Sequence, residues 1–334
     1  MAAAAPLVSI ITINYNQPEV TRDLLVSLRG SDYDRVEVIV VDNGSVDDPI
    51  PALRRDFPEV QFIRSEANLG FSGGNNLGIL ASRGDFLFFV NNDTELEADT
   101  ITRLLATYAD RPRLGALSPL ILYHPEVVEG QRDLIQYAGT TPLTAYTARN
   151  RTLGERQRNR GQYAAAHPTA YIHGAAMMIP RRVVAEVGLM PEFFFLYYEE
   201  LDWSERIRGA GYELYVEPRA RIFHKESVSV GQHSPLKTHY LTRNRILFMR
   251  RHRSGLAQFV FALFLVFFTI PKNVLRYWWK GEGEQARAFL RAVAWNLTEA
   301  KEQPNSVTWD PATWLAQSKT EIKGAPTASR LHKN

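Results

Sequence analysis

Four short apolar runs alternate with helix-like segments over residues 7–90, and this alternation constrains the fold more than any other feature of the sequence. Continuous apolar strands separated by helices are typical of a parallel sheet that is covered on both faces. We therefore predict an α/β fold with a mostly parallel sheet and flanking helices, in which ligands bind beyond the carboxyl ends of the strands. The predicted strands are 7–13, 36–41, 60–64 and 86–90, and the predicted helices are 19–28, 49–57 and a stretch that follows a loop at 70–78 and ends at Ser82.

The middle of the chain shows weaker patterns. We predict a helix over 95–105, an irregular stretch over 123–171, an ordered segment at 172–180, helices from Arg181 and over 199–208, and strands at 212–216 and 221–224. The irregular stretch is either a solvated loop or a mobile loop that meets phosphates, because it is rich in arginine. These arginines are Arg149, Arg151, Arg156, Arg158 and Arg160.

After residue 250 the character of the sequence changes. An apolar run over 256–270 ends at Pro271 and lies between a group of arginines and a Tyr-Trp-Trp cluster at 277–279. A helix of this length spans roughly 22 Å, which is short of the ~30 Å hydrocarbon core of a bilayer. We therefore expect an interfacial or re-entrant segment, with a buried helix packed on protein as the alternative. The predicted domains are 1–250, a C-terminal amphipathic or apolar helical segment over 251–306 that is associated with the membrane, and a polar, flexible tail over 307–334.

Composition narrows the function classes. The 334 residues carry a formal net charge of +3, which is less basic than is usual for a nucleic-acid binder, so we expect no nucleic-acid partner. The chain has no cysteine, which excludes disulfides and thiolate metal sites and fits a reducing cytoplasm. The first six residues lack a charged or apolar leader, so we expect no signal peptide.

Polar residues follow two of the predicted strands. Asp42 ends the second strand within Asp-Asn-Gly-Ser, which is also a good turn sequence. A carboxylate there could accept the imide N–H of uracil or thymine and so select a pyrimidine nucleotide. Asp93 follows Asn91 and Asn92 at the end of the fourth strand, where it could hold a divalent cation against a diphosphate or cap a helix. The glycine-rich stretch 68–78 allows close approach of the backbone to a ligand, but its spacing does not match a dinucleotide loop.

Three acids within four residues, Glu199, Glu200 and Asp202, directly follow an aromatic run over 193–198. Like charges this close repel one another unless a helix N-terminus, a cation or a function compensates. Apolar surroundings should raise the pKa of one of them toward a value suited to a general base. The alternative is ordinary charge at a helix N-terminus. His224 ends a later strand, and a lone histidine is more often a structural residue than a ligand.

Taken together, these residues resemble the family 2 glycosyltransferases of the GT-A fold, in particular their rhamnosyltransferase-like branch. Each piece is weak alone, but seven occur in the family's order within residues 7–250. The resemblance implies a GT-A (Rossmann-like), mostly parallel sheet with flanking helices. The pieces are residues 12–16, 41–45, 68–78, 91–93, 173–175, 198–203 and His224.

The resemblance also implies roles for individual residues. Asp93 stands at the last position of the family's D-x-D-type motif and would hold Mg²⁺ or Mn²⁺ together with His224. Because the first two motif positions are asparagines, metal affinity without nucleotide should be low. Glu200 stands at the general-base position, with Glu199 as the alternative and Asp202 as a further catalytic candidate. The implied sugar contacts are His173, Gly174 and Trp203, and the implied nucleotide site consists of Thr12, Tyr15, Asn16, Asp42, Asn68, Gly70, Gly73, Asn76, Asn92 and Asp93.

The activity that the resemblance implies is an inverting, metal-dependent transfer of a sugar to an acceptor hydroxyl. The branch favours dTDP-rhamnose as the donor, followed by UDP-sugars. The acceptor would be a glycan or a polyprenyl-diphosphate-linked sugar in the synthesis of cell-surface polysaccharide or lipid-linked glycan. We expect a cytoplasmic enzyme that is peripheral on the inner face of the cell membrane. The alternatives are a sugar nucleotidyltransferase, whose glycine- and lysine-bearing loop is absent from 12–18, a dinucleotide oxidoreductase, which the loop spacing disfavours, and a non-catalytic protein that binds nucleotide sugars or carbohydrate.

Overall fold

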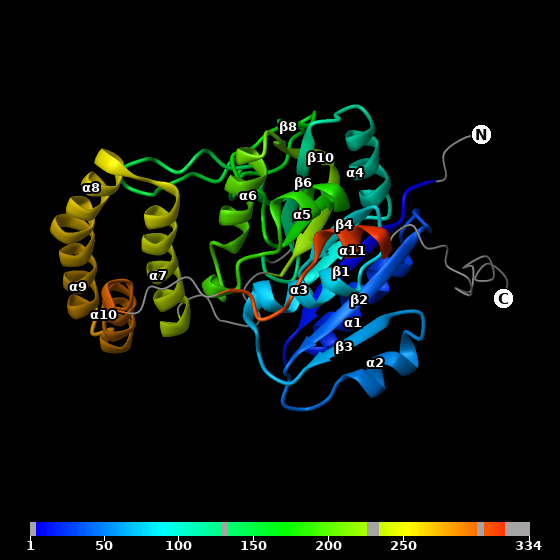
Figure 1. Cartoon of the computed structure of the whole chain (residues 1–334), viewed down its shortest axis with the longest axis horizontal. Coiled ribbons are helices and arrows are strands. Elements are labelled where there is room, and N and C mark those ends of the chain that lie inside the picture. The colour runs from blue at the N-terminus through cyan, green and yellow to red at the C-terminus, as the bar shows by residue number, and fades with distance from the viewer. Residues whose placement is uncertain (1–4, 129–132, 226–233, 299–303, 318–334) are drawn as a thin grey trace.

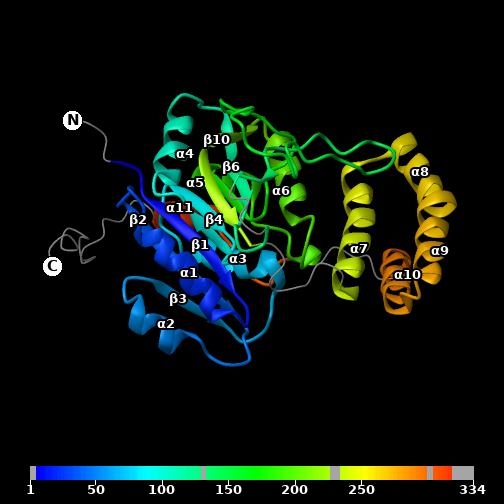
Figure 2. The same ribbon diagram turned by 180° about the vertical axis from the view of Figure 1, so that it is seen from behind.

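A computed structural model describes residues 5–128, 133–225, 234–298 and 304–317 (Figures 1 and 2). Strands and helices alternate in its first half, and helices dominate the last third. The strands are β1 (Val8–Asn14), β2 (Val36–Asn43), β3 (Gln61–Ser65), β4 (Phe86–Val90), β5 (Thr94–Leu96), β6 (Leu114–Tyr123), β7 (Ile135–Tyr137), β8 (His167–Pro168), β9 (Ala176–Pro180) and β10 (Glu213–His224). The helices are α1 (Pro18–Arg29), α2 (Ile50–Asp56), α3 (Gly70–Ala81), α4 (Thr100–Ala109), α5 (Arg181–Val187), a 3₁₀ turn (Glu192–Phe194), α6 (Glu199–Gly209), α7 (Pro235–His252), α8 (Gly255–Phe264), a π-helical turn (Leu265–Thr269), α9 (Ile270–Trp279), α10 (Gly283–Thr298) and α11 (Pro311–Gln317).

A single sheet of these strands forms the centre of the described structure, in the order β3-β2-β1-β4-β9-β6-β10-β5, with β7 paired to β6 and β8 to β10. The four predicted strands are β1 to β4, and they pair in parallel. Beyond β4 the sheet is mixed, because β9 runs antiparallel to β4 and β5 runs antiparallel to β10. The predicted α/β architecture with a mostly parallel N-terminal sheet is therefore confirmed.

Helices cover both faces of the sheet, as the continuous apolar strands predicted (Figures 1 and 2). Successive residues of a strand point to opposite faces. Ile10 of β1 accordingly packs in the cluster that contains Leu24 of α1 and Leu104 of α4. Its neighbour Ile11 packs in the opposite cluster, which contains Ile79 of α3 and side chains of α5, α6 and α11. The polar ends of β1, β2 and β4 lie at one edge of the sheet, and this edge carries the candidate site.

Several local predictions were wrong where tertiary contacts override sequence pattern. The predicted helix over 95–105 is instead the short strand β5 followed by α4, because Thr94–Leu96 pairs with the end of β10. The predicted loop at 70–78 is helical from Gly70 onward. The strands predicted at 212–216 and 221–224 are one strand, β10, with a bulge between Glu217 and Arg221.

The helices α7 to α10 stand apart from the sheet at one end of the molecule (Figure 1). The segment Gly255–Trp279 is one continuous run of 25 residues, long and apolar enough to cross a membrane by length and composition. It does not stop at Pro271, because the wider π-helical turn directly before α9 accommodates the missing N–H of the proline. The expected 15-residue limit was therefore wrong. The alternative of a buried core helix is also wrong, since only 11 % of the most apolar stretch is buried.

The predicted flexible tail over 307–334 needs a correction within its described part. Residues Pro311–Gln317 form α11, which packs against α5. Trp314 of α11 is 2 % exposed, its indole N–H donates to Ile79 O at 2.8 Å, and the guanidinium of Arg181 stacks on its ring. Residues 318–334 lie outside the described residues.

Candidate active site

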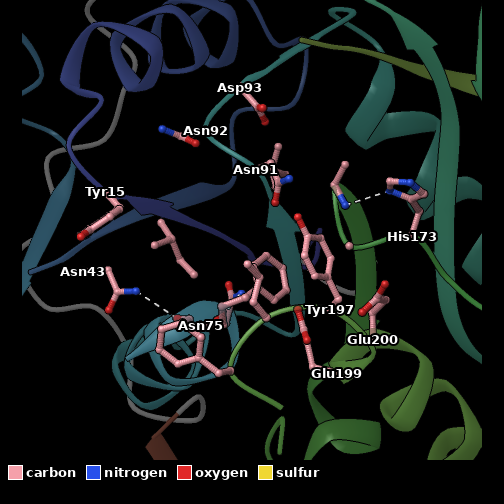
Figure 3. A pocket seen from close by; sticks show the side chains of 18 of the residues that line it. Tyr15, Asn43, Asn75, Asn91, Asn92, Asp93, His173, Tyr197, Glu199 and Glu200 are labelled. Atoms are coloured by element: carbon pink, nitrogen blue, oxygen red, sulfur yellow. Dashed lines mark hydrogen bonds between the residues drawn. The ribbon is translucent and has the colours of Figure 1, made fainter. Parts of the chain in front are cut away.

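A cleft of about 410 Å³ opens at the carboxyl ends of β1 and β4 (Figure 3). Its walls come from segments that are far apart in the sequence, which the parallel strand ends and the turn before α6 bring together. The residues that line it are Ile13, Tyr15, Asn43, Asn68, Gly70, Phe71, Asn75, Val90, Asn91, Asn92, Asp93, Gln136, His173, Gly174, Ala175, Phe195, Leu196, Tyr197, Glu199, Glu200, His224, Leu236 and Lys237.

One wall is the turn that precedes α3, and Asn43 at the end of β2 fixes it. The Asn43 amide donates to Asn68 Oδ1 at 3.1 Å and to Gly70 O at 3.0 Å, and its oxygen accepts from Leu69 N at 3.0 Å. Gly70 has φ of +71°, and a Cβ at this position would collide with the carbonyl oxygen of Phe195. Gly70 therefore allows the backbone to come close to another part of the protein, the turn before α6.

Asp42 lies beneath the cleft rather than on its surface. It is 1 % exposed, and its carboxylate accepts from Asn14 Nδ2 at 2.8 Å and from the Ser45 hydroxyl. Arg64 lies 3.4 Å from the same carboxylate. These donors fix the turns after β1 and β2. Contact of Asp42 with a pyrimidine base stays a prediction.

Of the other residues assigned to the nucleotide site, Tyr15, Asn68, Gly70, Asn92 and Asp93 line the cleft, and four do not. Thr12 is fully buried, and Gly73 packs against Leu69 within α3. Asn16 instead joins two turns through Ser45 and Val46. The fourth, Asn76, is discussed next.

Asn76 is fully buried, and both ends of its amide are already bonded. Its nitrogen donates to Met190 O at 3.0 Å and to Glu192 Oε1 at 2.8 Å, and its oxygen accepts from Met190 N at 3.1 Å. This amide holds the turn before the 3₁₀ helix against α3. The assignment of Asn76 to the nucleotide site is not supported by this arrangement.

Asp93 and His224 form a pair of buried groups at one end of the cleft (Figure 3 shows Asp93). Asp93 Oδ1 and His224 Nε2 lie 3.1 Å apart, and neither atom has a hydrogen-bond partner. His224 Nδ1 lies 2.8 Å from Gln136 Oε1, so with the proton on Nδ1 the Nε2 lone pair faces the carboxylate. Two unpaired acceptors at this distance call for a cation between them or a second proton.

The spacing of this pair fits a hard divalent cation. Two adjacent ligands of an octahedral ion, each ~2.1 Å from it, lie roughly 3.0 Å apart. Among the described residues no group of three or more His, Cys, Asp or Glu side chains is suited to a metal. Mg²⁺ commonly takes only one or two protein ligands and fills its other positions with phosphate oxygens and water. The donor set of Asp93 and His224 therefore fits a nucleotide-dependent metal site, as the asparagines at 91 and 92 suggested.

His173 and Gly174 lie on the wall between this pair and α6. The His173 Nδ1 accepts from Ala175 N at 3.1 Å, and its ring packs on Tyr137 with centroids 4.9 Å apart. Burial, with a further contribution from His224, lowers the pKa of His173 to about 3. The imidazole is therefore neutral at physiological pH. Both residues line the cleft, and their contact with a sugar stays a prediction.

Glu199 and Glu200 begin α6 on the opposite side of the cleft from Asp93 (Figure 3). Each has one carboxylate oxygen without a hydrogen-bond partner. Burial raises the pKa of Glu200 to about 7. Burial and the neighbouring charge of Glu200 raise the pKa of Glu199 well above its ordinary value. A pKa near neutrality suits a general base, so the electrostatics of Glu200 are consistent with that role.

Two predicted site residues on α6 have structural contacts instead. Asp202 is fully buried and accepts from Arg206 at 2.9 Å, Arg251 at 2.7 Å and His252 at 2.8 Å. Burial alone would raise its pKa, but the hydrogen bond from His252 and the two arginines hold the pKa of Asp202 below its ordinary value. Trp203 is fully buried, and its indole donates to Gly188 O at 2.8 Å. Asp202 therefore joins α6 to α7, and Trp203 belongs to the core.

Sequence reasoning also missed residues that the fold brings to the cleft. Asn43 lies within a recognised strand-end motif and could have been found there. Asn75, Gln136 and Tyr197 come from a buried helix, an irregular stretch and an aromatic run, whose patterns do not indicate a ligand. The arginine-rich loop does not line the cleft, and Arg149 instead stacks on Phe264 of α8.

Comparison with known proteins identifies the family of this chain. A sequence profile described as Glycosyl transferase family 2 matches residues 9–188. An N-acetylglucosaminyl-diphospho-decaprenol L-rhamnosyltransferase of Mycobacterium tuberculosis is 25 % identical over 264 residues, which cover 74 % of this chain and 85 % of the relative. The low-salt glycan biosynthesis hexosyltransferase Agl10 of Haloferax volcanii is 29 % identical and covers 60 % of this chain, with 61 % of its own length matched.

Among solved structures, the mannosyltransferase PcManGT from Pyrobaculum calidifontis in complex with GDP-Man and Mn²⁺ superposes with a TM-score of 0.55 at 16 % identity, covering 90 % of this chain and 89 % of that one. This likeness supports the GT-A fold. The family profile spans more than half of the 334 residues and includes most of β1, all of β2 to β4, and the cleft residues Asn43 and Asp93. A glycosyltransferase assignment sets aside the nucleotidyltransferase, oxidoreductase and non-catalytic alternatives. The chain belongs to glycosyl transferase family 2.

Proposed function

We propose that this protein is an inverting, metal-dependent glycosyltransferase that uses Glu200 as its general base. The observation that carries the proposal is the arrangement of the cleft. A pair of unpartnered buried ligands, Asp93 and His224, lies at one end, and a carboxylate whose pKa is raised to about 7 lies on the opposite side. The volume between them, about 410 Å³, is in the range of small-molecule sites.

The residues of the cleft support a single displacement. Glu200 takes the proton of the acceptor hydroxyl as its oxygen attacks the anomeric carbon of the donor sugar. The bond from that carbon to the diphosphate breaks on the far side, so the anomeric centre inverts. Asp93 and His224 would hold a divalent cation, which when bound neutralises charge on the departing nucleoside diphosphate. The neutral His173 and the backbone at Gly174 would position the sugar between the two groups.

For the donor we propose dTDP-rhamnose, with UDP-sugars as the second choice, and for the acceptor a polyprenyl-diphosphate-linked sugar. The support is the mycobacterial relative, whose name specifies rhamnosyl transfer to N-acetylglucosaminyl-diphospho-decaprenol. The mannosyltransferase with GDP-Man and Mn²⁺ supports a nucleotide sugar and a divalent cation in general.

The test measures release of nucleoside diphosphate from dTDP-rhamnose and a panel of UDP-sugars, with Mn²⁺, with Mg²⁺ and with EDTA. The acceptor is N-acetylglucosaminyl-diphospho-prenol, and Glu200→Gln is the control for adventitious hydrolysis. We expect metal-dependent release that the acceptor stimulates, and a product of inverted anomeric configuration. Absence of metal-dependent turnover with every donor, or a product of retained configuration, would refute the proposal.

We also propose that the helix Gly255–Trp279 attaches the enzyme to the inner face of the cell membrane, where a lipid-linked acceptor would lie. The helix buries Phe261 and Tyr277 against its neighbours, holds some apolar side chains half-buried, and exposes nine large ones. Three cations, Lys272, Arg276 and Lys280, are exposed near its end. Anionic headgroups attract such charges by about 1 kcal/mol each, and indoles settle at headgroup level. The exposed apolar side chains are Leu256, Phe259, Leu263, Val266, Phe267, Phe268, Leu275, Trp278 and Trp279.

Flotation with liposomes that contain anionic lipid tests this attachment. The variant Phe267→Ser/Trp278→Ser/Trp279→Ser removes three side chains that are 66 %, 80 % and 89 % exposed, so it should fold normally. The matched control is Leu297→Ser on α10, which removes an apolar side chain of 85 % exposure outside this helix. We expect the parent and the control to float at low salt and the triple variant to stay at the bottom. A parent protein that stays at the bottom, monodisperse without detergent, would show that the helix does not bind lipid.

A further inference from the structure

The turn that leads into Glu199 and Glu200 has an unusual backbone. Phe195, Tyr197 and Tyr198 have φ angles of 64°, 68° and 76°. Bulky residues rarely adopt positive φ, and such conformations persist only where the surrounding structure holds them. Phe195 and Tyr197 line the cleft, and Tyr198 directly precedes α6. The conformation of this turn, residues 193–198, therefore sets the direction in which the first residues of α6 point.

A single side chain of α7 holds most of this turn. Asn244 is fully buried, and its amide nitrogen lies within hydrogen-bond distance of three carbonyl oxygens, those of Phe194 at 2.9 Å, Leu196 at 2.7 Å and Tyr197 at 2.8 Å. Its oxygen accepts from Arg243 Nε at 2.8 Å. Because only an N–H donor can face three carbonyls, and the guanidinium occupies the other end, the amide has one allowed orientation.

Two further contacts close the clamp around the same turn. Arg243 donates from Nη2 to Phe194 O at 2.7 Å, in addition to its contact with Asn244. From the opposite side, Phe71 N at the start of α3 donates to Phe195 O at 2.7 Å. The turn is thus held between α3, whose first residues line the cleft, and α7, which lies outside the sheet.

We propose that Asn244 is a positioning residue for the general base, acting through the turn 193–198 rather than by contact with substrate. The inference rests on the proposed function, because it needs Glu200 to act as the base. Asn244 contacts no cleft side chain directly through its amide; its partners are main-chain carbonyls and Arg243. Loss of the clamp would let the turn relax, and Glu200 would lose its alignment with the acceptor. A displacement of about 1 Å at a reacting group can cost ~10²-fold in rate.

A second asparagine offers a matched control. Asn296 of α10 is also buried, and its amide nitrogen donates to Arg243 O and Ala292 O, both at 3.0 Å. It therefore braces α7 against α10 through its amide N–H donors, with its oxygen unpaired, and it makes no hydrogen bond with the turn 193–198. Equivalent substitutions at 244 and 296 should cost comparable stability and differ in their effect on catalysis.

The experiment compares Asn244→Asp and Asn244→Ser with Asn296→Asp and Asn296→Ser in steady-state transfer assays. We expect kcat to fall ~100-fold in Asn244→Asp, where a carboxylate faces three carbonyls, and less in Asn244→Ser, with the donor KM within threefold of the parent. The variants at 296 should keep the parent kcat. If Asn244→Asp does not fold, Asn244→Ser carries the comparison.

Two readouts separate positioning from a general loss of structure. In Asn244→Ser, water admitted around the loosened turn should shift the acid limb of the kcat–pH profile to a lower pH than in the parent. The charged or titratable groups that face the glutamate pair are Tyr137 of β7, Tyr198, and Arg243 of α7, and none of them is changed. Hydrogen exchange of residues 194–198 should accelerate in the variants at 244 and not in those at 296.

The outcomes distinguish this inference from the proposed function. Parental kcat and an unmoved acid limb in Asn244→Ser, in an otherwise active enzyme, would overturn the positioning role and leave the function intact. Equal losses of kcat at 244 and 296 would also overturn it, because both would then act through stability. A parent protein without turnover on any donor refutes the proposed function, and that result does not depend on Asn244.

Discussion

Replacing Glu200 with glutamine should reveal two opposite consequences of burying this carboxylate. Glutamine keeps the shape of the side chain but cannot accept a proton from the acceptor. Loss of a general base commonly lowers the rate ~10²–10⁴-fold, which corresponds to about 3 to 5 kcal/mol of transition-state stabilisation. We expect kcat to fall by this factor, while the donor KM changes little because the proposed role of Glu200 is toward the acceptor.

The same substitution should stabilise the fold. Burial raises the pKa of Glu200 from 4.5 to about 7, a difference of about 2.5. At 1.36 kcal/mol per pKa unit, ionising the native carboxylate above pH 7 costs up to about 3 kcal/mol relative to the unfolded chain. Glu200 lines the cleft and is partly reached by solvent, so we expect about 1 to 3 kcal/mol. At about 2.1 cal/mol/K of unfolding entropy per residue, this corresponds to an increase in Tm of roughly 1.5 to 4 °C for a chain of 334 residues.

The pH dependence of this gain follows from its sign. Below pH 4.5 the carboxyl is protonated in both states, so parent and variant should have similar stability. Between pH 4.5 and about 7 only the unfolded carboxyl ionises, and the parent progressively loses stability. Above pH 7 the difference should stay constant. The acid limb of kcat in the parent should titrate near the same pH, about 7.

Thermal unfolding and kcat, each measured from pH 4 to pH 9, check both parts. Glu199→Gln is the matched comparison, because it makes the same change at the neighbouring buried carboxyl and should lose less activity if Glu200 is the base. An inactive Glu200→Gln that is no more stable than the parent at pH 8 would refute the burial argument. Near-parental turnover of Glu200→Gln together with an inactive Glu199→Gln would move the base to Glu199.

The remaining predictions concern the metal pair and the buried acid of α6. Asp93→Ala should weaken nucleotide affinity in the presence of Mn²⁺ by at least ~10-fold, and His224→Ala should do so less severely. Calorimetry with dTDP and UDP, with and without Mn²⁺, measures this, and equal affinities in variant and parent under both conditions would contradict the metal assignment. Asp202→Asn should cost about 3 to 5 kcal/mol in urea unfolding at pH 7.5, because it leaves the charges of Arg206 and Arg251 without their partner. The pKa of Asp202 is lowered in the native state, so its stabilisation is present above the ordinary value near pH 4 and is lost as the pH falls further. An unchanged unfolding midpoint, or loss of activity per folded molecule, would contradict a purely structural role for Asp202.

Asp93 and His224 could each be placed at a strand end from sequence, whereas their pairing as metal ligands came from the family resemblance and stays a prediction. Asp93 ends the run before β5, and His224 ends β10, which pairs with β5 so that His224 lies opposite Thr94. The two-residue periodicity of a strand indicates where the strand ends, and parallel strands have their carboxyl ends at the same edge of the sheet. The pairing itself was not visible, because a three-residue strand such as β5 carries too little pattern to be told from a helix.

The errors concern side chains whose partners are distant in the chain. Asn76 bonds to Met190, 114 residues away, and Asp202 bonds to Arg251, 49 residues away. Within its sequence motif, each of these two residues resembles a ligand-binding residue, because binding sites and buried cores use the same polar side chains. Trp203 is comparable: an indole next to acids suits a sugar platform, yet the helical spacing of α6 points it to the sheet, where Phe89 meets it edge to face at 5.4 Å. Only the tertiary structure distinguishes a ligand-binding side chain from a structural one.

The return of α11 to the sheet has a practical consequence for protein engineering. The polypeptide leaves the catalytic fold with α7, forms the apolar helices, and comes back so that Trp314 closes the outer layer over Ile79 and Arg181. The helices α7 to α10 are therefore inserted between two segments of the chain that pack together in one folding unit. A C-terminal truncation that removes the apolar helices would also strip this cover and expose the core beneath it. A detergent-free version of the enzyme should instead be built by replacing the exposed side chains of Gly255–Trp279, with residues 304–317 left in place.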